Sequence, residues 1–130
     1  MRLPAHLLQQ IIGHPVDRFS GSGHKRLLGR VDVGSQATVF PIHGELLDEP
    51  IPVTVRNVSA ETVGLILLRA MMPSAGLIIR FPLADGQFLA IRSRVMRCSP
   101  QANGRFYMAA QFQELVDPQS TFTLLNRAES

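Results

Sequence analysis

The chain has 130 residues, of which 45% are hydrophobic and 18% are charged; this is the composition of one folded domain and excludes a disordered protein. Its single cysteine, Cys98, excludes an internal disulfide framework and fits a reducing compartment. The formal net charge of +3 is too small for a strong general nucleic-acid binder, and no apolar run approaches the roughly 20 residues that span a bilayer.

The N-terminal residues predict a helix and then a linker. Four aliphatic residues recur at helical spacing within residues 4–12: Leu7, Leu8, Ile11 and Ile12. We expect no signal peptide there, because the segment has no small-residue cleavage site. Residues 17–23 contain the run Ser-Gly-Ser-Gly, which is typical of a flexible linker. We therefore predict a short N-terminal helical extension and linker over residues 1–24, and a folded domain over residues 25–130.

Six later segments have the features of β-strands, which are alternation of apolar and polar residues or a short apolar run between turn signals. They cover residues 38–42, 51–58, 63–68, 77–81, 87–98 and 105–115. Pro41 favours an edge position for the first strand, because proline cannot donate to a ladder. Asp117 and Pro118 suit the start of a short C-terminal helix.

This pattern predicts an all-β fold, a six-stranded antiparallel β-barrel, because closure removes exposed strand edges. A barrel of this size is filled by its own side chains. A ligand would therefore bind on its outer surface.

No constellation of catalytic or metal-binding residues stands out. The sequence lacks H-E-x-x-H, C-x-x-C and G-x-S-x-G motifs, and its four histidines have no metal-ligand spacing. We therefore expect no enzymatic activity, no metal and no cofactor.

One pair of motifs remains. Arg26 and Arg30 stand four residues apart after the predicted linker, and Asn57 and Ser59 follow at a strand end. Here the sequence resembles the PilZ domain family, whose signature is R-x-x-x-R followed by [DN]-x-S-x-x-G. The resemblance covers residues 25–127 and includes the later strand pattern.

The resemblance implies a bacterial, cytoplasmic receptor that binds cyclic di-GMP on the outside of the barrel and signals through a protein partner. It implies no binding of nucleic acid and no membrane insertion. An arginine fork binds a phosphate or the O6/N7 edge of guanine, and the two motif arginines would close over the ligand. The ligand-binding residues implied are Arg26, Arg30, Asn57, Ser59, Thr62 and Gly64.

The sequence departs from the signature at Thr62, which stands at the motif glycine. If that position needs a positive φ, threonine costs about 1–2 kcal/mol there; if it needs close approach of a base, threonine obstructs the base. Gly64 would then take the tight backbone position through a shifted turn.

Two other interpretations stay open. A PilZ-like domain that has lost the nucleotide would serve as a protein-interaction module, in which Asn57 and Ser59 only hold a turn. A small barrel that binds single-stranded nucleic acid is a further alternative, although such sites need exposed stacking aromatics and only 6% of the residues are aromatic.

Overall fold

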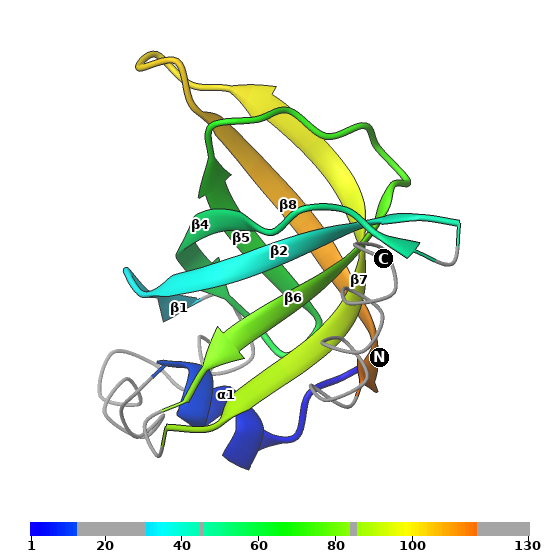
Figure 1. The fold of residues 1–130 in the computed structure, drawn as a ribbon. Coiled ribbons are helices and arrows are strands. Elements are labelled where there is room, and N and C mark those ends of the chain that lie inside the picture. The colour runs from blue at the N-terminus through cyan, green and yellow to red at the C-terminus, as the bar shows by residue number, and fades with distance from the viewer. Residues whose placement is uncertain (13–30, 45, 84–85, 117–130) are drawn as a thin grey trace.

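The computed structural model describes residues 1–12, 31–44, 46–83 and 86–116 (Figure 1). Arg26, Arg30, the predicted linker and the predicted C-terminal helix lie outside the described residues. The boundary at residue 24 stays a prediction for the same reason.

The described residues form one helix and eight strands. In chain order these are α1 (Ala5–Ile12), β1 (Val31–Asp32), β2 (Gln36–His43), β3 (Leu46–Leu47), β4 (Ile51–Val58), β5 (Thr62–Leu67), β6 (Gly76–Pro82), β7 (Phe88–Pro100) and β8 (Phe106–Val116). The six longer strands are the predicted ones, each within two residues of its expected ends. The sequence analysis did not predict β1 and β3, which have two residues each.

The six longer strands close into an antiparallel barrel in the order β4-β5-β8-β7-β6-β2, and pairing of β2 with β4 completes the ring (Figure 1). The predicted fold class is confirmed. Alternate residues of every strand point into the barrel, where Phe81 and Phe112 meet edge to face at 6.4 Å between ring centroids. The filled interior leaves the outer surface for ligands.

The edge position expected for β2 is wrong, because β2 pairs with β4 and β3 on one side and with β6 on the other. Pro41 is tolerated since it falls in a gap of the ladder. Pairing with β4 ends at Val39, and pairing with β3 begins at Ile42. The missing proline N–H therefore breaks no ladder hydrogen bond on that side.

Helix α1 covers one end of the barrel (Figure 1). Its apolar side chains Leu8, Ile11 and Ile12 are buried in the same core cluster as the inward-facing residues of the strands. The backbone just before the helix is also fixed, since the Leu3 N–H donates to the carbonyl of Ala60 at 2.6 Å. The N-terminal residues therefore reach the turn between β4 and β5, which carries the second half of the predicted motif.

Candidate ligand-binding face

The motif residues lie on the outer face of β4 and β5, beside β8 and β7. Asn57 on β4 pairs in register with Gly64 on β5, and Gly64 pairs with Ala109 on β8. Ala109 in turn pairs with Arg97 on β7. A bulge between Val55 and Asn57 inserts Arg56 as an extra residue and turns the end of β4. The register therefore places Asn57 and Arg97 at the two ends of one row across four strands, with the small residues Gly64 and Ala109 between them.

Gly64 gives this row its shape. A Cβ atom built at Gly64 would lie against the hydroxyl of Tyr107, 2.8 Å from Tyr107 Cζ and 2.6 Å from Asn57 Oδ1. Real Cβ atoms do not approach other atoms so closely, so only glycine fits under the tyrosine ring. Gly64 lies within strand β5 at an ordinary φ, so close packing and not a shifted turn requires glycine at this position.

Asn57 and Tyr107 form the polar centre of the face. Asn57 Nδ2 donates to the Tyr107 hydroxyl at 3.4 Å. Asn57 Oδ1 is buried and has no hydrogen-bond partner among the described residues. The Arg97 guanidinium lies 6.0 Å from the Tyr107 ring centroid, at the limit of cation–π attraction. A buried acceptor without a partner is costly, and a donor supplied by a ligand would satisfy it.

Ser59 and Thr62 hold the turn between β4 and β5. The Ser59 hydroxyl oxygen accepts from the backbone N–H of Thr62 at 3.1 Å and of Glu61 at 3.3 Å. It also shares a 2.8 Å hydrogen bond with the Thr62 hydroxyl. Ser59 is only 8% exposed. Its hydroxyl is therefore committed to the turn in this structure.

The strain considered for Thr62 is absent. Ser74 is the only non-glycine residue with a positive φ in the part of the chain that the structure describes, so Thr62 takes an ordinary strand conformation. Its hydroxyl bonds to Ser59, a contact that glycine could not make.

Ser59→Ala should lower the free energy of unfolding by about 1–2 kcal/mol, because it leaves two backbone N–H groups without their acceptor and the Thr62 hydroxyl without its hydrogen-bond partner. Urea denaturation measures this loss. Ser99→Ala, at an exposed position on β7, is the control and should change stability by less than about 0.5 kcal/mol. Equal stability of the two variants would show that the turn does not depend on the Ser59 hydroxyl.

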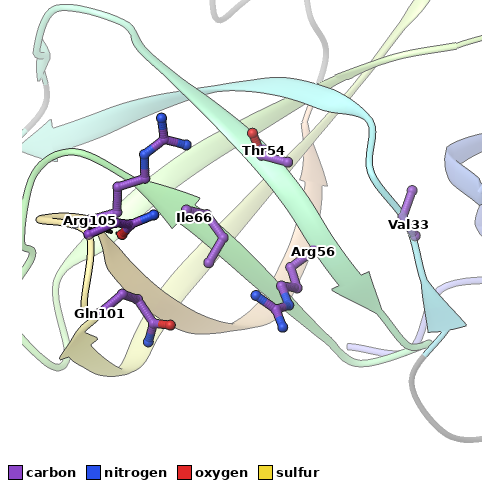
Figure 2. Close-up of a pocket in the computed structure, with 7 residues that line it drawn as sticks. Val33, Thr54, Arg56, Ile66, Gln101 and Arg105 are labelled. Atoms are coloured by element: carbon purple, nitrogen blue, oxygen red, sulfur yellow. Dashed lines mark hydrogen bonds between the residues drawn. The ribbon is translucent and has the colours of Figure 1, made fainter.

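A cavity of about 280 Å³ opens on the same outer face (Figure 2). Its lining residues come from β4, β5, the segment after β1 and the connection between β7 and β8: Val33, Thr54, Arg56, Ile66, Gln101, Asn103 and Arg105. Figure 2 shows Ile66 between the side chains of Arg56 and Arg105. A second hollow of about 130 Å³ shares Thr54, Ile66 and Arg105 with the first.

The charge of this face is positive. Arg56 and Arg105 line the larger cavity with no acidic residue among its lining residues. Arg94 and Arg97 are exposed on the neighbouring strand β7. Guanidinium groups arranged in this way suit an anionic ligand such as a phosphate ester.

The structure thus brings four of the predicted site residues together, namely Asn57, Ser59, Thr62 and Gly64. The two motif arginines lie outside the described residues. The sequence analysis did not assign Tyr107 or Arg56 to the site. It missed Arg105 altogether. These residues come together through the strand register, which places Ile66 opposite Tyr107 and Thr54 opposite Ile66.

The described residues contain neither a metal-binding cluster nor a membrane-spanning helix. No group of three His, Cys, Asp or Glu side chains in residues 1–12, 31–44, 46–83 and 86–116 lies close enough to hold a metal ion. No helix within these ranges is long and apolar enough to cross a membrane.

Comparison with known proteins supports the fold. No protein-family model matches the chain, and no curated protein matches it. Among solved structures, the chain is similar to the Bacillus subtilis inhibitor of motility (MotI/DgrA), with a TM-score of 0.54 and 15% identity. The match covers 75% of this chain and 46% of that protein, so the chain spans about half the length of its structural relative. At this identity the likeness shows the fold alone, and the barrel fits a PilZ-like fold.

Proposed function

We propose that the protein is a cyclic di-GMP receptor that binds the nucleotide on the outer face of β4, β5, β7 and β8. The observation that carries the proposal is the buried, unpartnered Oδ1 of Asn57 beside Gly64 and Tyr107. The N2 amino group of guanine is a donor of the kind this acceptor lacks, and the Asn57 amide would turn outward to meet it because Oδ1 is buried in the free protein.

The surroundings of Asn57 support the same ligand. Arg97 and Arg56 flank it and carry the positive charge that a ligand with two phosphates needs. Arg26 and Arg30 complete the signature in the sequence. Their side chains would bind a phosphate or the guanine O6/N7 edge, as the family resemblance implies.

The receptor would signal through a protein partner in the cytoplasm and carry out no catalysis. The structural relative is named an inhibitor of motility, which is a regulatory activity. This likeness supports a regulatory role for the present chain, whose partner would bind a surface altered by the bound nucleotide.

A second function is favoured by one specific observation. The Ser59 hydroxyl is already bound within the turn, as it would be in a domain that no longer binds the nucleotide. Leu68 and Met72, in the connection between β5 and β6, are 74% and 76% exposed. A PilZ-like protein-interaction module without nucleotide is therefore the alternative.

Isothermal titration with cyclic di-GMP separates the two functions. We expect the wild-type protein to bind, and Arg26→Ala and Arg30→Ala each to weaken binding more than tenfold, because a hydrogen bond to a charged group contributes about 1.5–3 kcal/mol. Arg69→Ala is the charge-matched control, since within the described residues Arg69 makes one exposed ion pair, with Asp48 at 3.8 Å. This variant should bind like the wild type. Absence of heat and of any shift in melting temperature at high ligand concentration would favour the interaction module.

A further inference from the structure

The larger cavity, of about 280 Å³, lies next to Asn57 and is lined by Arg56 and Arg105. Neither of these arginines belongs to the PilZ signature. We propose that the cavity between Arg56 and Arg105 is a subsite that holds one guanylyl half of the cyclic dinucleotide, while the polar centre at Asn57 and Tyr107 holds the other half. This inference rests on the function proposed above and names the residues that take the far end of the ligand.

The position and size of the cavity fit half of the ligand. Arg56 lines it and directly precedes Asn57, while Ile66 lines it and lies opposite Tyr107 in register. The cavity therefore lies beside the polar centre of the face, because two of its lining residues are direct neighbours of Asn57 and Tyr107. Its volume of about 280 Å³ lies just below the range of about 300–1,000 Å³ for pockets that bury a drug-sized ligand, which suits one guanylyl half better than the whole dinucleotide.

The donors in the cavity match a guanylyl group. Neither the Arg56 nor the Arg105 guanidinium makes an ion pair or hydrogen bond with another residue in the described ranges. Both guanidinium groups are therefore available to bind a phosphate or the O6/N7 edge of guanine. Ile66, at the centre of the cavity (Figure 2), offers an apolar surface to the flat face of the base.

The connection between β7 and β8 fixes the place of Arg105. The Gln101 N–H donates to the carbonyl of Arg105 at 2.7 Å, and the Arg105 N–H donates to Asn103 Oδ1 at 3.3 Å. Gly104 supplies the positive φ of 81° that closes the turn. These contacts hold the backbone of Arg105 in place before any ligand arrives, which lowers the ordering cost of binding.

The test is titration of the full chain with cyclic di-GMP, comparing wild type, Arg105→Ala and Arg92→Ala. We expect Arg105→Ala to weaken binding about tenfold or more, and Arg92→Ala to bind within about twofold of wild type. Arg92 is the matched control because it also removes one exposed arginine, but it pairs with Ile78 and Glu114 toward the other end of β7. Equal melting temperatures would show that both variants are folded.

Each outcome decides the inference. Loss of affinity in Arg105→Ala but not in Arg92→Ala supports the subsite, and ligand-dependent protection of the amides of residues 101–105 from hydrogen exchange would support it independently. If Arg105→Ala binds like Arg92→Ala while Arg26→Ala loses binding, the subsite is wrong and the receptor function stands. If the wild-type protein does not bind cyclic di-GMP, the receptor function and the subsite both fall.

Discussion

Gly64→Ala should lower the free energy of unfolding by about 2 kcal/mol and disrupt ligand binding on the outer face. The added Cβ atom would meet Tyr107 Cζ at 2.8 Å and Asn57 Oδ1 at 2.6 Å, so both side chains must move. Overpacking of this kind typically costs about 1–3 kcal/mol. Because the displaced residues are the polar centre of the proposed site, affinity for cyclic di-GMP should fall together with stability. Chemical denaturation and isothermal titration measure the two effects.

Gly34→Ala is the matched control for this substitution. Gly34 has an ordinary φ and nothing within 4 Å of the position of an added Cβ, so its replacement should leave stability unchanged or slightly raised. A double variant, Gly64→Ala with Tyr107→Ala, should cost less than the sum of the two single changes, because the tyrosine is no longer there to clash. Strict additivity would contradict the close contact between Gly64 and Tyr107.

The strands could be predicted from the sequence because each long strand carries its own local signal. Residues 51–58 alternate in the strand period, and the predicted bounds are those of β4. Strands β1 and β3 carry no such signal, since two residues are too few to show a period. The prediction of an edge position for β2 rested on Pro41 and is wrong. Proline removes one backbone donor, on one side of the strand, and the rest of the strand can still pair on both sides.

The site was only partly predictable because its residues meet through the register, which is a long-range property. Asn57 and Gly64 belong to one hairpin and to one motif, and the sequence places them together. Arg56 and Arg105 line one cavity although they are distant in the chain and belong to no common motif. Tyr107 lies on a strand with apolar residues on both faces, so alternation alone could not assign its side chain to the outer surface.

Phe112→Ala should have the largest effect on stability, about 3–5 kcal/mol. The Phe112 ring is fully buried in the barrel and packs edge to face on Phe81. Its removal loses apolar burial and leaves a cavity that a closed barrel cannot readily collapse. Against a total stability of about 5–15 kcal/mol for a domain, we expect the melting temperature to fall on the order of 15 °C. Thermal unfolding followed by circular dichroism measures the shift.

The same substitution separates stability from binding, because the hydrogen bond between Phe112 and the motif turn uses the backbone of Phe112. Its N–H donates to the Glu61 carbonyl at 2.9 Å, and alanine retains this bond. At a low temperature where the variant is folded, its affinity for cyclic di-GMP should therefore stay within about threefold of wild type, in contrast to Gly64→Ala. Phe88→Ala is the control for loss of a phenylalanine, since Phe88 is 47% exposed and should cost about 1 kcal/mol or less. Loss of binding by folded Phe112→Ala would mean that core packing, rather than the backbone bond alone, holds the turn that carries Ser59 and Thr62.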